Sequence, residues 1–308
     1  MKPPVVTISY SELQALRRCQ FRHHLEYVQG WTKEKAPDSP AGFGTAWHDV
    51  LNAYYGHQAS AYRTHYDSAW RKAREVIDEK PEGIQEPLRW MLEGYAAHYS
   101  NEPGWRVIAV ERKLIVRLPQ LRSDLAINLK CKIDLVIQDI KTHKVWVDDH
   151  KSKKQLPATS NSYRDPQLPL YMFAWNRTYP NLQAHGARYS YALVPGKRKR
   201  PLEDEWDKRF RRTPVPYTEQ ELETIARDAY QTAYQAYRDG SLSDYPPRSL
   251  SPDCSWCDYR DPCRLNLRGR DLDQGLTDYG FTRWRDEPKA PAIPDTDEET
   301  EIDVQQAG

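Results

Sequence analysis

The chain has little cysteine and no long apolar segment. Five cysteines among 308 residues are too few for a disulfide scaffold, so they indicate metal binding, catalysis or simple burial. No apolar run approaches the ~18 residues that a membrane-spanning helix needs. The first residues also lack the apolar stretch of a secretory signal. The sequence therefore predicts a cytoplasmic protein without a membrane span.

The sequence contains no G-x₄-GK[ST] pattern, so a nucleotide-driven motor would have to be another chain. Its net charge of +1 is unevenly distributed. Residues 286–308 hold eight acids and one lysine, a composition typical of a disordered tail. The other 285 residues carry an excess of eight positive charges. That excess suits contact with a polyanion, although ordinary solubility accounts for it equally well.

The first third of the chain is predicted to be helical. Ser9 opens a capping box with Glu12, so a helix is expected from Ser9 that carries Cys19 on its later turns. After a break at residues 37–44, a second helix is expected over 45–55, ended by Gly56. Two amphipathic stretches, at residues 59–79 and 86–99, complete this part.

The middle of the chain changes to strand periodicity. Strands are expected at residues 105–118, 125–140 and 145–151, forming an antiparallel meander with one buried face. Alternation places one set of apolar residues on that face: Ile127, Leu129, Cys131, Ile133, Leu135 and Ile137. A helix at 166–178 and a strand at 187–194 follow. The predicted fold class is α/β with an αβββαβ core.

A polar stretch and another helix follow this core. Residues 195–216 contain the basic run 197–200, which is either a solvated loop or a contact for a phosphate backbone. Thr218 and Glu221 form a second capping box, which opens a helix that ends near Gly240.

Carboxylates and a lysine gather on neighbouring predicted strands. Asp149 and Lys151 are two residues apart and therefore point to the same face, and Asp134 can meet Asp149 across the ladder. Two carboxylates that converge repel each other unless a cation lies between them, and Mg²⁺ or Mn²⁺ prefers such oxygen ligands. The ammonium of Lys151 would then stabilise charge that grows on a phosphate. Taken alone, this spacing also occurs on solvated strands.

Asp134, Asp149 and Lys151, placed in this order of predicted strands and helices, resemble the active-site pattern of the PD-(D/E)XK nuclease superfamily. The resemblance extends over about residues 7–268 and implies a restriction-endonuclease-like core. It places the acid of the second strand at Asp134 and the (D/E)-x-K motif at Asp149 and Lys151. Glu111 falls on the preceding strand, where relatives often carry an acid. A surface glutamate paired with a lysine or arginine would look the same.

Two further motifs resemble the RecB-like branch of this superfamily. Residues 44–48 fit its G-x-x-x-H helix, which implies that His48 completes the metal sphere, and the backbone carbonyl of His150 is a further expected ligand. Gln167 and Tyr171 fit its Q-x-x-x-Y helix, which implies hydrogen bonding in the active site. Packing of Tyr171 and ordinary burial of His48 are the alternatives.

The remaining motif is made of cysteines. Three lie in a C-x₂-C-x₅-C pattern, and Cys19 is the candidate for a fourth ligand, while Cys131 fits a core position. The three are Cys254, Cys257 and Cys263. One N-terminal cysteine with a C-terminal trio resembles the iron–sulfur branch of the RecB-like nucleases, as in CRISPR adaptation exonucleases and AddB-type nuclease domains. This implies a structural [4Fe–4S] cluster, with Zn²⁺ as the alternative. In both cases the metal would clasp the two ends of the chain around the core.

These expectations divide the chain into four parts: a helical part at 1–104, a nuclease core at 105–216, a Cys-rich extension at 217–270 and an acidic tail at 271–308. The predicted function is Mg²⁺- or Mn²⁺-dependent hydrolysis of DNA, as an exonuclease acting at ends or in single strands. A recombination, CRISPR or helicase chain is the expected kind of partner. A non-catalytic nucleic-acid-binding scaffold with a Cys₄ zinc site and a structure-specific endonuclease are the alternatives.

Overall fold

The computed structural model of the chain describes residues 3–60, 66–99, 104–158, 165–195, 205–239 and 246–284. The predicted basic run 197–200, the helix end at Gly240 and the acidic residues of 286–308 lie outside these ranges. Within them, no helix combines the length and the apolar character that crossing a membrane requires.

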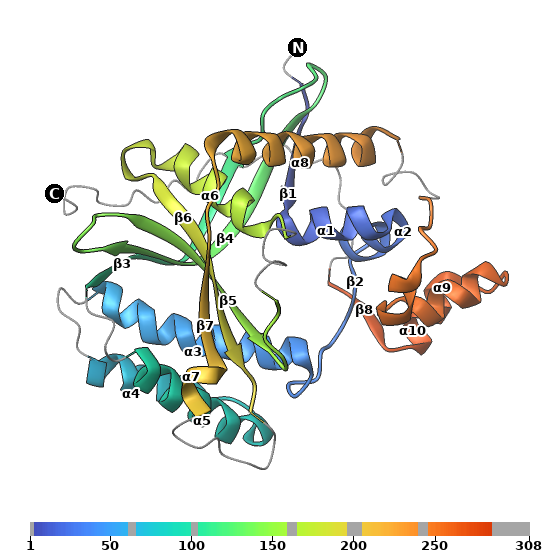
Figure 1. Cartoon of the computed structure of the whole chain (residues 1–308). Helices are drawn as coiled ribbons and strands as arrows, with labels where there is room; N and C mark the ends of the chain where they lie inside the picture. The colour runs from blue at the N-terminus through green and yellow to red at the C-terminus, as the bar shows by residue number, and fades with distance from the viewer. Residues whose placement is uncertain are drawn as a thin grey trace.

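A mixed sheet of six strands lies at the centre of the fold (Figure 1). Its strand order is β1-β4-β5-β6-β7, and β3 pairs with β4. Antiparallel pairing joins β3 to β4, β4 to β5 and β6 to β7, whereas β1–β4 and β5–β6 are parallel. The strands are β1 (Val5–Ser9), β3 (Trp105–Arg117), β4 (Ala126–Asp139), β5 (Val145–Lys153), β6 (Ala184–Leu193) and β7 (Phe210–Val215). The predicted αβββαβ order is confirmed, and β1 and β7 are additions to it.

One edge of β4 is shared by two strands. β3 pairs with β4 over residues 128–139, whereas β1 pairs with 126–130 and β5 with 135–138. Because β3 overlaps both, β1 and β5 must occupy the opposite edge of β4. Residues 131–134 lie between them, where the ladder on this edge is interrupted. Asp134 therefore sits where β1 and β5 separate.

Helices cover both faces of the sheet (Figure 1). One face carries α3 (Pro40–Ser60), α4 (Tyr66–Asp78) and α5 (Glu82–Tyr99), and the other carries α1 (Tyr10–Arg18), α6 (Gln167–Thr178) and α8 (Glu219–Asp239). The prediction of one buried face is therefore wrong. Ile133 packs in the core beside α6 and α8, whereas Leu135 and Ile137 pack beside α3–α5. Strict alternation along β4 is broken at Asp134.

The N-terminal segment begins with a strand that the sequence analysis missed. Ser9 ends β1 and caps α1, because its Oγ accepts the N–H of Glu12 at 3.1 Å. The helix ends at Arg18, so Cys19 does not lie on a helical turn: it is extended, with φ −166° and ψ 118°. A short α2 (Gln20–His23) and a π-helical turn (His24–Val28) follow. Cys19 therefore lies half-buried at a break between two helices.

The second predicted helix is longer than expected at both ends. It begins at Pro40, because Ser39 accepts the N–H of Gly42 at its side chain and that of Phe43 at its carbonyl. Proline suits the first helical position, where its missing N–H costs nothing. The helix then continues through Gly56 to Ser60.

Other boundaries also differ from the prediction. Residues 195–216 include α7 (Trp206–Arg209) and edge strand β7, and a 3₁₀ turn (Pro180–Leu182) precedes β6. The capping box at the start of α8 is confirmed, since Thr218 Oγ1 accepts the N–H of Glu221 at 3.2 Å and Glu221 accepts the N–H of Thr218 at 2.7 Å.

The C-terminal extension packs against the start of the chain. It contains a 3₁₀ turn (Pro252–Trp256), α9 (Arg260–Leu267), α10 (Leu272–Asp278) and β8 (Phe281–Arg283). Strand β8 pairs antiparallel with β2 (Trp31–Lys33), and a third core lies beneath them. The beginning of segment 271–308 is therefore folded, in contrast to the predicted tail. Its apolar residues Leu276 and Phe281 are the reason, because both are buried in this core.

Candidate active site

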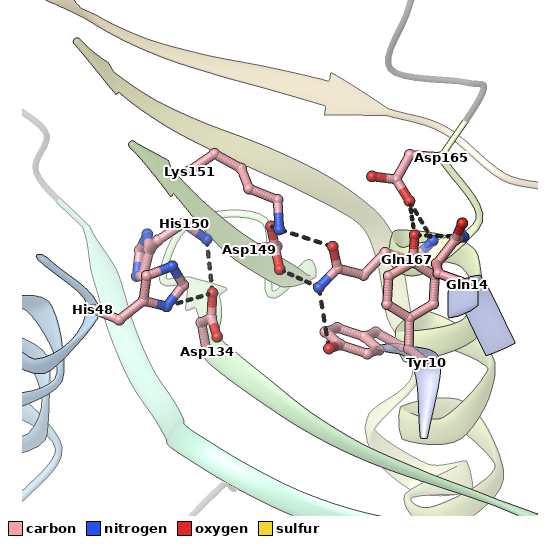
Figure 2. Close-up of polar contacts among 10 residues, drawn as sticks. Tyr10, Gln14, His48, Asp134, Asp149, His150, Lys151, Asp165 and Gln167 are labelled. Carbon is pink, nitrogen blue, oxygen red and sulfur yellow. Dashed lines mark hydrogen bonds and ion pairs between the residues drawn. The ribbon is translucent and has the colours of Figure 1, made fainter. Parts of the chain in front are cut away.

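Asp134 lies in the interrupted part of β4 and is almost completely buried. Its Oδ2 accepts the main-chain N–H of His150 at 2.8 Å and lies 3.4 Å from Nδ1 of His48 (Figure 2). Burial alone would raise the pKa of this carboxyl group. The hydrogen bond and charge of His48 and the N–H of His150 outweigh burial and lower the pKa to about 2. Asp134 is therefore a carboxylate at neutral pH.

His48 and Glu111 converge on the same carboxylate. One ligand atom from each of His48, Glu111 and Asp134 lies within 4.8 Å of the others, and the described residues contain no other such group of three or more His, Cys, Asp and Glu side chains. His48 is delivered by α3, which approaches β5 closely: a Cβ atom added at Gly44 would lie 3.4 Å from Ser152 Oγ. Burial would lower the pKa of His48, but Asp134 raises it overall.

Glu111 is held by an unusual backbone. Its φ is +50°, a left-handed conformation inside strand β3 that costs a residue with a Cβ about 1–2 kcal/mol. The register pairs Val110 with Leu135 and Arg112 with Ile133, so Glu111 stands opposite Asp134. Its carboxylate also contacts the ammonium of Lys132. Glu111 therefore both pairs with a lysine, as a surface glutamate would, and lies close to Asp134 and His48.

Asp149 and Lys151 lie side by side on β5, with Gln167 of α6 beside them (Figure 2). Oδ2 of Asp149 is 2.6 Å from Lys151 Nζ, and Oδ1 accepts a hydrogen bond from Gln167 Nε2 at 2.8 Å. Lys151 Nζ donates to Gln167 Oε1, also at 2.8 Å. The three side chains therefore close a ring of polar contacts. The predicted proximity of Asp149 and Lys151 is seen in the structure, whereas Asp149 is outside the three-residue group around Asp134.

The pKa values of both charged groups in this ring are raised, but for different reasons. Burial, together with the charge of Asp134, raises the pKa of Asp149 to about 6, although Lys151 acts to lower it. For Lys151, burial would lower the pKa, but the charge of Asp149 outweighs burial and raises it. Lys151 therefore remains an ammonium at neutral pH, beside a carboxyl group that titrates in the mildly acidic range.

The Q-x-x-x-Y pair also lies in the site. Gln167 Nε2 donates to Tyr171 OH at 3.1 Å. The sequence analysis missed two residues beyond this pair: Tyr10 of α1 donates to Asp165 Oδ1, and the same oxygen accepts the N–H of Gln167 at 3.0 Å. An aspartate directly before a predicted helix was the available signal for Asp165. No sequence signal linked Tyr10 to it, because they are 155 positions apart.

The neighbouring residues of β5 point to the opposite face, as alternation predicts. Asp148 is fully buried and makes two hydrogen bonds with Arg188, at 2.7 and 2.6 Å. The ring of His150 stacks on Tyr55 with a centroid distance of 5.8 Å. Burial lowers the pKa of His150 to about 4, so its imidazole is neutral at pH 7. The His150 side chain is not part of the three-residue group that could hold a metal ion.

A family model described as the PD-(D/E)XK nuclease superfamily matches residues 7–264. The chain belongs to this superfamily. PD-(D/E)XK nucleases use divalent metal ions and act on nucleic acid, and the donor set fits such an ion. A charged buried carboxylate, a second carboxylate and an imidazole converge in this nuclease at Asp134, Glu111 and His48. Oxygen-rich sets of this kind suit Mg²⁺ or Mn²⁺.

Two solved structures resemble this PD-(D/E)XK nuclease at low sequence identity. A crystal structure described as "Putative exonuclease" from Eubacterium rectale is 14% identical, with a TM-score of 0.50 over 84% of this chain and 88% of the other. This similarity supports the assignment of the fold. A crystal structure described as SSO0001 is 12% identical, with a TM-score of 0.36 over 82% and 83% of the two chains. A search of curated proteins returned no match.

Four of the five cysteines lie around one cavity of about 560 Å³ at the C-terminal extension. They are Cys19, Cys254, Cys257 and Cys263. The fifth, Cys131, is buried in the core as expected, and burial raises the pKa of its thiol to about 12. Among the described residues, no three of these four sulfur atoms all lie within 4.8 Å of one another. Five arginines line the same cavity: Arg18, Arg22, Arg248, Arg260 and Arg264.

Proposed function

We propose that this nuclease is a Mg²⁺- or Mn²⁺-dependent deoxyribonuclease that hydrolyses phosphodiester bonds. The observation that carries the proposal is the closed contact of Asp149, Lys151 and Gln167 beside the carboxylate of Asp134. These residues come from three elements, β4, β5 and α6, and three of them carry charge in a mostly buried place. A solvated surface would not need such an arrangement.

Each side chain has a distinct proposed role. Asp134, Asp149, Glu111 and His48, with the backbone carbonyl of His150, would hold the metal ion. When bound, a divalent ion supplies Lewis acidity and lowers the pKa of water. Lys151, as an ammonium, positions the attacking water and stabilises negative charge that develops on the phosphate. Gln167 and Tyr171 keep Lys151 beside Asp149.

We infer that the substrate is DNA with a free end or a single-stranded region. The exonuclease description of one structural neighbour and the RecB-like motifs support this choice over an endonuclease. The basic residues of 151–154, which leave the site along β5, lie where a phosphate backbone would be attracted. A helicase, recombination or CRISPR chain remains the predicted kind of partner.

The test uses matched DNA substrates with added Mn²⁺ or Mg²⁺. The chain is incubated with a linear single strand and with a closed circular strand of the same sequence. We expect degradation of the linear strand only, and its loss in Lys151→Ala with the fold intact by circular dichroism. Lys72→Ala is the control, because this lysine is exposed on α4 and pairs with Glu75 there, outside the ring. Cleavage of the circle would make the protein an endonuclease, and binding without cleavage of either strand would refute catalysis.

We also propose that the four-cysteine cavity holds a structural [4Fe–4S] cluster. In a tetrahedral zinc site with Zn–S bonds of about 2.3 Å, the sulfurs are about 3.8 Å apart. The sulfurs here are spread more widely, which suits a larger group. The surrounding arginines would offset the charge of the thiolates. Purification without oxygen, followed by iron, sulfide and zinc analysis, tests this: a stoichiometric zinc ion without iron would refute it.

A further inference from the structure

A hydrogen-bond chain connects the first helix of the protein to the candidate catalytic lysine (Figure 2). Tyr10, the first residue of α1, donates its hydroxyl proton to Oδ1 of Asp165. The same Oδ1 accepts the main-chain N–H of Gln167 at 3.0 Å, where α6 begins. One carboxylate oxygen therefore fixes the start of α6 relative to α1.

Gln167 transmits this placement to the charged pair. Its amide orientation is determined by its neighbours: a lysine ammonium only donates, so it faces Oε1, and a carboxylate only accepts, so it faces Nε2. Gln167 thus holds Lys151 and Asp149 at the same time. A rotation or shift at the beginning of α6 would break both contacts together.

A second contact supports the same placement from Tyr10. Its ring meets the ring of Tyr171 edge to face, with a centroid distance of 6.3 Å. Tyr171 in turn accepts the second amide hydrogen bond of Gln167 at 3.1 Å. Asp165 and Tyr171, which both hydrogen-bond to Gln167, therefore both contact Tyr10.

From this geometry, we propose that Tyr10 and Asp165 are positioning residues that hold Gln167, and through it Lys151, in the arrangement needed for hydrolysis. This inference rests on the proposed nuclease function. Among the described residues, the hydrogen bonds of Tyr10 and Asp165 reach Lys151 only by way of Gln167, so their positioning effect passes through Gln167. A merely structural role would predict lost stability without a specific effect on turnover.

Three variants separate these roles. Tyr10→Phe removes one hydroxyl and keeps the ring against Tyr171. Asp165→Ala removes the acceptor, whereas Asp165→Asn keeps one carbonyl oxygen that can accept both hydrogen bonds. We expect Tyr10→Phe and Asp165→Ala to lower kcat about tenfold while KM changes less than twofold, and Asp165→Asn to restore most of the activity. The double variant Tyr10→Phe/Asp165→Ala should be no slower than Asp165→Ala, because both act through one contact.

The matched control is Tyr234→Phe. Tyr234 also donates its hydroxyl proton to an aspartate, Asp124, at 3.1 Å, but on the surface of α8. We expect its kcat to equal that of the wild type. Equal kcat values for wild type and Tyr10→Phe, or an unrescued Asp165→Asn, would overturn the positioning role.

A measurement without turnover distinguishes this inference from the nuclease proposal. The rate at which acetic anhydride modifies Lys151, followed by mass spectrometry of metal-free protein, reports how firmly the ammonium is held. We expect faster modification in Tyr10→Phe and Asp165→Ala, and no change in Tyr234→Phe. If the wild type hydrolyses no DNA but the modification rates change as expected, the positioning role of Tyr10 and Asp165 is supported and the proposed function is refuted. Unchanged modification rates would refute the positioning role.

Discussion

The carboxylate of Asp134 takes the place of a missing ladder partner for the backbone of His150. Its Oδ2 accepts the His150 N–H at 2.8 Å, where β4 and β5 stop pairing. A buried N–H must find an acceptor, so this bond serves the fold and orients a charged side chain at once.

We predict that Asp134→Asn and Asp134→Leu separate these two tasks. The asparagine oxygen can still accept the N–H, so the fold should remain intact while Mn²⁺ affinity falls at least tenfold. Leucine leaves the N–H unpaired and should cost about 1–3 kcal/mol of unfolding free energy as well. Calorimetric titration with Mn²⁺ and urea unfolding measure the two effects. Undiminished Mn²⁺ binding by the asparagine variant would show that Asp134 is not a ligand.

The left-handed backbone of Glu111 predicts an inverted order of stability. In an ordinary strand, glycine is less stable than alanine, but at φ +50° the Cβ is the unfavourable feature. We expect Glu111→Gly to be more stable than Glu111→Ala by about 1 kcal/mol. Both should bind Mn²⁺ more weakly than the wild type because the carboxylate is gone. Urea unfolding compares the two, and an alanine variant of equal or greater stability would argue against strain.

The raised pKa of Asp149 predicts a pH-dependent loss of stability in the metal-free protein. The folded-state pKa is about 6, against about 3.9 in the unfolded chain. The native state therefore keeps a proton that the unfolded state has lost, and this stabilisation disappears as pH rises from about 4 to above 6. The lowered pKa of His150 has the opposite effect on stability over the same range, so the contribution of Asp149 is measured as the difference in unfolding free energy between the wild type and Asp149→Asn, in EDTA from pH 4.5 to 7.5. We expect the wild type to lose stability relative to Asp149→Asn as pH rises, and a difference that does not change with pH would exclude this contribution of Asp149.

If the four-cysteine cavity holds the proposed cluster, loss of Cys257 should affect the N-terminal segment and the C-terminal extension together. We expect Cys257→Ser to lower iron content and Tm, and to expose residues near both Cys19 and β8 to hydrogen exchange. Cys131→Ser is the matched control, because Cys131 lies in the sheet core: it should lower Tm through packing while iron content stays unchanged. Iron retained at full stoichiometry in Cys257→Ser would contradict this ligand assignment.

The buried pair of Asp148 and Arg188 predicts strong coupling. Both side chains are less than 10% exposed and share two hydrogen bonds. Arg188→Ala leaves an unpaired buried charge and should cost about 3–5 kcal/mol, whereas Arg188→Met with Asp148→Leu should recover much of this loss. The exposed pair Lys72 and Glu75 is the control, and its removal should change stability little. Additive effects of the two buried substitutions would refute the coupling.

Local patterns in the sequence were sufficient for several elements. The alternation of residues 125–140 predicted β4, and the capping boxes at Ser9 and Thr218 predicted two helix starts. These signals depend on neighbours a few positions apart, so they survive without tertiary context. Strands β1 and β7 were missed, because short edge strands are defined by the partner that accepts them.

The sequence by itself determined which side chains share a face: Asp149 and Lys151 share a strand face because side chains alternate, and Gln167 and Tyr171 share a helix face because residues four apart align. Tertiary structure alone decided how these groups meet. It separated β1 from β5 along β4, turned Glu111 toward Asp134 through a left-handed backbone, and brought Tyr10 to Asp165. Contacts of this range depend on the packing of whole elements, and no local spacing records them.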